Sequence, residues 1–302
     1  MRRTLRIFPP YYLFLLICFA VALFSRNYVL SGKLWSSFAL YATSLVVILP
    51  WFGPALSAVP TPASGIDLTW SLSIEELFYL LWAPAVRFLG KRLLFWVVIA
   101  VILFAPALRW YMHTPGQKTE YFFFPTRMDS LAFGALLALL WESKHLWRIS
   151  GWQAMTGLTA AGCALWMTRD PRGDARFVVF GYTLIAIAMA FVVAFVLQRA
   201  GTRNLFCRAL RSNLLVRIGT ISYMFYLLHL FVIRVSTAVF STLLSSHWAL
   251  NRALSFSTSL ALTLLLASLS WKYFESPILR LKSRFGTERA RTEEAQASVV
   301  AA

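Results

Sequence analysis

Long apolar runs separated by short polar or basic segments dominate the 302-residue chain. A run of about 20 apolar residues is long enough to cross a bilayer as a helix. The runs predict spans near residues 11–30, 69–87, 93–108, 126–141, 152–168, 177–197, 214–240 and 250–272. A further run at 34–52 carries scattered Ser and Thr and ends in a Pro-Trp-Phe-Gly-Pro sequence. The pattern predicts an all-α integral membrane protein, a polytopic bundle of about eight spans.

The distribution of Lys and Arg bears on the run at 34–52. If this run crosses the membrane, the basic loops at 87–92 and 199–217 lie opposite the basic N-terminus. If it dips in and returns, every strongly basic segment lies on one side. Short loops rich in Lys and Arg stay in the cytoplasm. We therefore expect one re-entrant segment at 34–52, with both chain ends in the cytoplasm.

Composition supports the membrane interpretation. The chain is 59% hydrophobic and only 14% charged, whereas soluble proteins average about 25% charged residues. A net charge of +17 would suggest nucleic-acid binding in a soluble protein, but here the basic residues lie between apolar runs, so no nucleic-acid partner is expected. The three cysteines have no paired spacing, and neither a metal site nor a tightly bound cofactor is expected.

A polar stripe interrupts the predicted span at 69–87. On a helix, Ser71, Glu75 and Tyr79 recur every four residues and share one face. A carboxylate at membrane depth is costly, about 2.5–3.5 kcal/mol on insertion scales, so it normally faces a protein interior or a wet cavity. Glu75 is therefore the leading candidate for a functional residue.

Glu76 points about 100° away from Glu75 on a helix and serves a different purpose. Ser73 and Glu76 have the spacing of a capping box, which would make them the start of the helix. The alternative is that Glu76, together with Trp70 at the beginning of the stretch, contacts substrate.

A second polar cluster, Thr126-Arg127-Met128-Asp129-Ser130, opens the span at 126–141. One interpretation is another capping box, formed by Thr126 and Asp129, with Arg127 extending its charge to the membrane surface. The other places Arg127 and Asp129 in a functional site. A third cluster lies in the span at 214–240, where Ser222, Tyr226 and His229 share one helix face.

His229 has two interpretations. An intramembrane His is often a hydrogen-bonded structural residue, but a Ser–Tyr–His stripe is typical of a pathway or site. Its predicted depth, with that of Glu75, permits one polar cavity in the outer half of the membrane, near Arg127. A carboxylate and an imidazole there can support general base catalysis on a hydroxyl or proton transport, and both remain open.

Basic and acidic residues also lie at the predicted cytosolic ends of the spans. Arg2, Arg3 and Arg6 are either topology signals or a phosphate-binding patch. Glu275, just before Pro277, is expected to pair with Lys272 or Arg280 at the inner surface.

Together these residues resemble the membrane-bound acyltransferases of family 3, which O-acylate bacterial envelope and secreted glycans. The resemblance rests on Arg2-Arg3-x-x-Arg6-Ile7-x-Pro9-x-Tyr11, Trp70-Ser71-Leu72-Ser73-Ile74-Glu75-Glu76-x-Phe78-Tyr79-Leu80, Thr126-Arg127-x-Asp129-Ser130-Leu131, Ser222-Tyr223-x-x-Tyr226-Leu227-x-His229 and Tyr273-x-Glu275-x-Pro277. The stretch from Trp70 is specific, whereas the other motifs gain weight from occurring together and in the family's order.

The resemblance implies an enzyme of the bacterial inner membrane that moves an acyl group, expected to be acetyl, from cytosolic acyl-CoA to a glycan hydroxyl. It implies catalytic roles for Glu75, Arg127, Tyr226 and His229. Substrate-binding roles are implied for Arg3, Arg6, Trp70, Ser71, Glu76, Tyr79, Asp129, Ser222, Tyr223 and Glu275. The expected domains are a membrane acyltransferase domain at 1–285 and a polar, disordered tail at 286–302.

The chain departs from the family at its start. Members begin with two further helices, the first carrying an Arg and, about three turns on, a His regarded as catalytic. Met1 stands where an interior loop residue is expected, so the natural gene is expected to start upstream. His229 matches a later motif and does not replace the missing His. Two alternatives therefore remain: a transporter or flippase that uses the same polar cavity, and an inactive truncated fragment.

Overall fold

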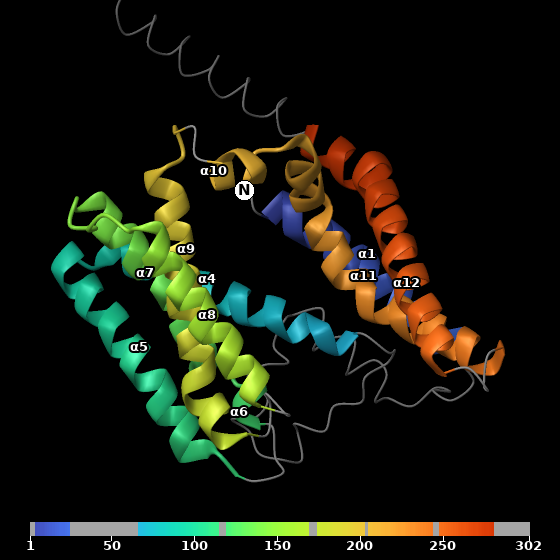
Figure 1. Ribbon diagram of the computed structural model, residues 1–302, viewed down its shortest axis with the longest axis horizontal. Coiled ribbons are helices and arrows are strands. Elements are labelled where there is room, and N and C mark those ends of the chain that lie inside the picture. The colour runs from blue at the N-terminus through green and yellow to red at the C-terminus, as the bar shows by residue number, and fades with distance from the viewer. Residues whose placement is uncertain are drawn as a thin grey trace, which may run out of the picture. The chain divides into compact units, whose positions relative to one another are not determined.

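The computed structural model describes residues 4–24, 66–114, 119–168, 174–202, 205–243 and 248–280 (Figure 1). Every regular element in these ranges is helical, which confirms the predicted all-α class. The elements are α1 Thr4–Phe24, η3 Ile66–Thr69, α4 Trp70–Phe88, α5 Lys91–Met112, α6 Thr119–Phe122, η4 Phe124–Arg127, α7 Met128–Glu142, α8 Gly151–Met167, η5 Phe177–Gly181, α9 Tyr182–Gln198, α10 Leu205–Leu210, α11 Asn213–Leu243, α12 Trp248–Ser270 and η6 Trp271–Glu275.

Four helical stretches are long and apolar enough to cross a membrane: Lys91–Met112, Phe177–Gln198, Asn213–Thr242 and Trp248–Arg280. The helices at the other predicted spans are shorter, less apolar or interrupted by charge, so the count of eight stays a prediction. The proposed re-entrant run at 34–52, Arg3 and the tail at 286–302 lie outside the described residues.

The chain divides into two compact units, and each is considered by itself. One unit includes residues 69–211 and therefore α4 to α10. Its α5 and α7 run antiparallel, because Lys91 pairs with Glu142 at one end and Arg109 pairs with Asp129 at the other. The α8–α9 pair packs beside them, with α7 against α9 (Figure 1).

Side chains at the end of α9 fix the connection between α7 and α8. The Gln198 amide accepts a hydrogen bond from the Ile149 N–H and donates one to the Trp147 carbonyl, both at 2.8 Å. Arg199 donates to the Ile149 carbonyl. A capping box of Ser150 with Gln153 then starts α8, because its first N–H groups have no partner within the helix.

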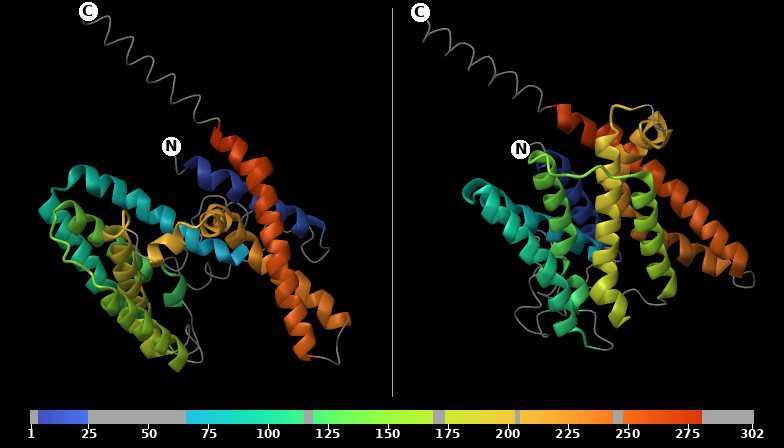
Figure 2. Two further views of the ribbon diagram at one scale, coloured as in Figure 1. Left: turned by 45° about the horizontal axis from the view of Figure 1, so that its top comes forward. Right: turned by 60° about the vertical axis from the view of Figure 1, so that its left-hand side comes forward.

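The other unit includes α1, α11, α12 and η6. The α11 and α12 helices lie side by side over much of their length (Figure 2). Small residues form the buried seam of α12 at every fourth position: Ser255, Ser259, Thr263 and Ala267. Small side chains let helix backbones approach closely, which is how helices associate where lipid removes the hydrophobic drive.

The η5 segment is a π-turn that leads directly into α9, and Gly181 closes it. A Cβ atom at Gly181 would lie 2.5 Å from Cδ2 of the buried Phe177 ring. That ring also packs against Tyr182, with centroids 5.3 Å apart, so it cannot shift freely. Glycine is therefore required for packing at this turn.

We predict that Gly181→Ala lowers the stability of the protein by about 1–3 kcal/mol, because the added methyl overpacks the Phe177 ring. Gly162→Ala in α8 is the matched control, since a Cβ there meets no atom within 4 Å. The control should gain up to about 1 kcal/mol of helix propensity. Thermal unfolding in detergent measures both, and equal melting temperatures for the two variants would contradict the prediction.

Candidate functional site

A buried ion pair joins α5 to α7. Arg109 and Asp129 are both wholly inaccessible to solvent. Arg109 Nη2 lies 2.8 Å from Asp129 Oδ2, and Nη1 lies 3.2 Å from Oδ1. This two-pronged geometry is the strongest form of arginine–carboxylate pairing. Thr183 of α9 joins the pair, accepting from Arg109 at 2.6 Å and donating to Asp129 at 2.7 Å.

The same guanidinium also holds two irregular turns. Its Nε and Nη2 donate to the Val179 carbonyl in the π-turn η5 at 3.3 and 3.1 Å. Its Nη1 donates to the Thr126 carbonyl in η4. One side chain thus ties together α5, α7, α9 and both turns. Arginine suits this role because its five N–H donors have a fixed planar arrangement.

Arg127 lies beside this ion pair in a cluster of aromatic rings. Its guanidinium carbon is 4.0 Å from the centroid of Tyr182, 5.3 Å from Tyr121 and 5.8 Å from Trp70. Its Nη1 is buried and has no hydrogen-bond acceptor among the described residues. The interpretation in which Arg127 extends its charge to the membrane surface is therefore wrong, because packing with rings from α4, α6 and α9 holds the guanidinium inside.

The capping-box interpretation of Thr126 and Asp129 is also wrong. Thr126 Oγ1 lies 2.6 Å from the carbonyl oxygens of both Glu120 and Phe123, which are the acceptors for its one proton. Asp129 is engaged by Arg109 and Thr183, and no side chain caps α7. Local sequence spacing suggested a cap, but tertiary partners far along the chain occupy both groups.

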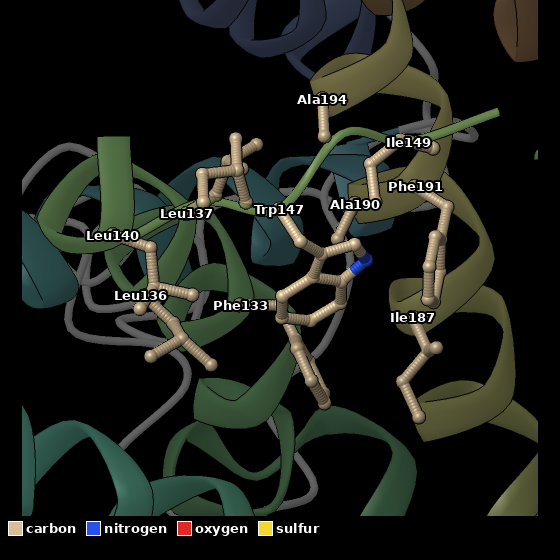
Figure 3. Close-up of a pocket in the computed structure, with 11 residues that line it drawn as sticks. Phe133, Leu136, Leu137, Leu140, Trp147, Ile149, Ile187, Ala190, Phe191 and Ala194 are labelled. Carbon is tan, nitrogen blue, oxygen red and sulfur yellow. The ribbon is translucent and has the colours of Figure 1, made fainter. Parts of the chain in front are cut away.

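A cavity of about 500 Å³ begins at Arg127 and lies between α7 and α9. Its walls are Arg127, Ser130, Phe133, Gly134, Leu137, Tyr182, Ile185, Ala186, Met189, Ala190 and Val193. A smaller apolar pocket of about 120 Å³ shares Phe133, Leu137 and Ala190 with it. Figure 3 shows this second pocket, with Trp147 among the side chains of α7 and α9. The two volumes therefore adjoin along the same pair of helices.

The predicted stripe on α4 is partly buried. Ser71, Glu75, Glu76 and Tyr79 are all half-buried, while Ser73 is buried and donates to the Thr69 carbonyl at 3.2 Å. The Ser73–Glu76 capping box does not form, because Thr69 occupies the cap position without a side-chain bond.

Trp70, at the start of this stretch, contacts the Arg127 cluster directly. Its ring lies 4.9 Å from Tyr121 and 5.4 Å from Phe122, measured between centroids. The first turn of α4 is thereby joined to the site, while Glu75 follows about one turn later on the same helix.

The remaining predicted residues lie in the other unit. Glu275 is buried and accepts from Ser270 Oγ at 3.0 Å, with Arg6 as an electrostatic neighbour. Lys272, a predicted partner of Glu275, instead lies 5.0 Å from the centroid of Tyr273. Arg6 of α1 is thus an electrostatic neighbour of Glu275 at the end of η6.

The Tyr and His residues of α11 make contacts within this unit. Tyr223 donates to the Ile7 carbonyl at 3.1 Å, and Tyr226 donates to the Leu68 carbonyl at 3.3 Å. His229 Nδ1 lies 2.7 Å from the Tyr226 carbonyl. A carbonyl only accepts, so Nδ1 carries a proton in this hydrogen bond. Ser222 donates to the Gly219 carbonyl of its own helix.

The predicted cavity shared by Glu75, Arg127 and His229 joins residues of different units and stays a prediction. Sequence reasoning missed Arg109 and Thr183, and it missed the pair of His113 Nδ1 with Glu120 Oε1 at 2.8 Å. Glu120 is wholly buried, and its Oε2 has no partner among the described residues. The available signal was Arg109 itself, a lone cation directly after an apolar run.

Comparison with known proteins gives one family. A family model described as an acyltransferase domain matches residues 1–272. The chain is 27% identical over 223 residues to an O-acetyltransferase, OatA, of Staphylococcus aureus, covering 69% of this chain and 35% of that protein. It is 28% identical over 233 residues to a peptidoglycan O-acetyltransferase, OatA, of Listeria monocytogenes, covering 73% and 36%.

A further relative is an acyltransferase, MdmB, of Streptomyces mycarofaciens, 27% identical over 305 residues, covering 94% of this chain and 74% of that protein. The chain thus spans about a third of the length of the OatA proteins that it matches. No solved structure matches.

We predict that Arg109→Ala or Asp129→Ala destabilises the protein by about 3–5 kcal/mol, because each leaves an uncompensated buried charge. Arg109→Lys should recover only part of the loss, since an ammonium cannot hold both carboxylate oxygens and two carbonyls in one plane. Thermal unfolding of the single and double variants measures the coupling.

The matched control is Lys91–Glu142, which joins the same two helices but is largely exposed, at 78% and 61%. Breaking that pair should cost no more than about 1 kcal/mol. Comparable losses at both pairs would show that burial does not govern the strength of the α5–α7 connection.

Proposed function

The chain belongs to the acyltransferase domain family, and we propose that it is an integral membrane O-acyltransferase acting on a hydroxyl of a glycan. The O-acetyltransferases among its relatives favour acetyl as the transferred group. The observation that carries the proposal is Arg127, a cation held among aromatic rings at one end of a cavity of about 500 Å³. Ligand sites commonly have volumes of about 300–1,000 Å³ with a few fixed polar groups.

The environment of Arg127 suits transfer chemistry. Attack of a hydroxyl on an acyl carbonyl develops negative charge on oxygen, and a fixed cation in a water-poor site stabilises that charge. The Arg109–Asp129 pair flanks Arg127 and holds the Thr126 carbonyl before it. Little reorganisation is then needed when charge develops at this position.

We assign the general base to Glu75. A carboxylate within hydrogen-bond reach of a hydroxyl can take up its proton as that hydroxyl attacks the acyl carbonyl. Trp70, Ser71, Glu76 and Tyr79 of the same helix are assigned to binding the acceptor. His229 and Tyr226 are assigned supporting catalytic roles in the other unit, with Ser222 and Tyr223 beside them.

The proposed donor is acyl-CoA that enters from the cytoplasm of a bacterial cell, at the inner membrane. Its phosphates suit the guanidinium groups of Arg3 and Arg6, because arginine binds phosphate with two parallel hydrogen bonds. The buried Glu275 near Arg6 is assigned to fixing that side chain. Both chain ends then lie in the cytoplasm, as the basic loops favour.

The first test is transfer of radiolabelled acetyl from acetyl-CoA to envelope glycan in membranes that contain the protein. Glu75→Gln should retain insertion and abundance but lose at least about 100-fold in rate, the scale of general base catalysis. The amide keeps the shape of the side chain and removes its ionisation. Glu142→Gln, at an exposed position of α7, is the matched control and should transfer like the wild type.

Two results would count against this assignment. Undiminished transfer by Glu75→Gln would assign Glu75 to structure alone. No transfer by the wild type to any endogenous glycan, with expression confirmed by immunoblot, would reject the enzyme and favour a transporter, for which substrate-dependent proton movement in vesicles is the corresponding measurement.

We predict that Arg6→Ala raises the apparent KM for acetyl-CoA about tenfold, the scale of one charge-assisted hydrogen bond. Arg6→Lys should restore only part of the affinity, since its point charge lacks the planar fork. Arg252→Ala, at a cation that instead lies 5.5 Å from the centroid of Trp248, serves as the control. A KM that is unchanged in Arg6→Ala would leave this residue as a topology signal.

A further inference from the structure

The cavity at Arg127 continues as an apolar groove. On α7, Ser130, Gly134 and Leu137 line it at intervals of three or four residues after Arg127. On α9, Tyr182, Ala186, Met189 and Val193 do the same. Such spacing places each set on one face of its helix. From Arg127 to Leu137 the groove extends roughly 15 Å along α7, at 1.5 Å per residue.

Asp129 lies two residues after Arg127 but makes its hydrogen bonds elsewhere. Asp129 Oδ1 accepts from Arg109 and from the Ser130 N–H, at 3.2 and 2.9 Å. Its Oδ2 accepts from Arg109 and from Thr183, at 2.8 and 2.7 Å. A carboxylate has about four acceptor positions, so Asp129 has none left for Arg127. Aromatic faces offset part of the burial of the cation, and an anion supplied by a ligand would complete the site.

The groove is open along its side. Met189 and Val193 at its rim are 43% and 48% exposed, and Gly134 leaves a gap in the α7 wall because a Cβ there meets no atom within 4 Å. The small residues Gly134, Ala186 and Ala190 line the groove without filling it. A slot with one cation at its end and apolar walls beyond is complementary to an anionic head with an unbranched apolar chain.

We propose that this groove binds a lipid phosphate, with the phosphate at Arg127 and Ser130 and the chain between α7 and α9, and that the acceptor glycan is carried on that phosphate. The inference rests on the proposed function for the identity of the cargo. A phosphate diester explains all three features, because it provides the anion, its lipid arm fills the apolar groove and its other arm delivers the sugar to the Arg127 cluster.

A bulk phospholipid is the competing occupant. It would satisfy the charge and the groove but would place no sugar ring where Trp70 and Tyr121 surround Arg127. A lipid-carried glycan places a sugar at this position, where the sugar can stack against these aromatic rings. The site therefore favours the carrier lipid over the surrounding bilayer.

Binding is tested with three probes that separate head from chain: dodecyl phosphate, methyl phosphate and dodecanol. The protein is placed in nanodiscs of zwitterionic lipid, and each probe displaces a fluorescent alkyl phosphate. Dodecyl phosphate should bind at least about tenfold tighter than either fragment. Arg127→Gln should reduce its affinity to that of dodecanol, and Gly134→Leu should reduce it toward that of methyl phosphate.

Gly162→Leu in α8 is the matched control, because it makes the same change at an equally open position outside the groove. It should bind dodecyl phosphate like the wild type, and melting curves establish that all variants are folded. Wild-type affinity in both Arg127→Gln and Gly134→Leu would overturn the groove as the binding site. Displacement by phosphatidylglycerol at equal affinity would make the occupant a bulk lipid and overturn the carrier.

The acyl-transfer assay then shows whether the acceptor glycan is carried on the lipid phosphate. A disaccharide joined to dodecyl phosphate should have a KM at least about tenfold lower than the free disaccharide, and Gly134→Leu should remove that difference by raising the KM of the lipid-linked substrate. Equal KM values in the wild type would overturn the carrier and leave the proposed function standing. Acylation of neither substrate, with dodecyl phosphate still bound, would instead reject the proposed function and its cargo while leaving a lipid-phosphate site.

Discussion

The buried pair of Arg109 and Asp129 is the contact on which the larger unit depends. Removing two charges from water costs several kcal/mol each, and only near-complete hydrogen bonding offsets that cost. Here the carboxylate accepts four hydrogen bonds and the guanidinium also reaches two backbone carbonyls. The pair therefore specifies one arrangement of α5, α7 and α9, since a shifted helix would leave some of these groups unpaired.

The helices themselves were predictable from the sequence because apolar runs and their polar breaks are local features. The runs at 93–108 and 177–197 correspond to α5 and to η5 with α9. The partners of the polar residues were not predictable, because Arg109 and Asp129 lie 20 positions apart and Thr183 lies 54 positions beyond Asp129. The spacing of Thr126 and Asp129 suggested a local cap, and tertiary bonds took its place.

The prediction of a functional Arg127 rested on its place in a polar cluster at the start of a span, and its aromatic neighbours come from three other segments. Tyr121 lies in the short helix α6, and Tyr182 follows the π-turn. No local pattern in the sequence identifies rings that converge on a cation. In the other unit, by contrast, most hydroxyls of α12 donate to carbonyls one turn back in the same helix. These polar groups need no partner on another helix, and their small side chains form a packing seam.

Arg109 and Arg127 lie close together in space but differ in whether a carboxylate balances their charge. Arg109 has its carboxylate and is saturated, which suits a group that fixes structure. Arg127 has aromatic faces and, among the side chains that the structure describes, no hydrogen-bonded carboxylate. Arg109, Thr183 and the Ser130 backbone use every acceptor position of Asp129. The Arg109–Asp129 pair carries no net charge, so it holds Arg127 in place without neutralising it. A membrane protein that retains such a cation bears its desolvation cost in the unbound state, and the binding of an anion recovers part of that cost as affinity.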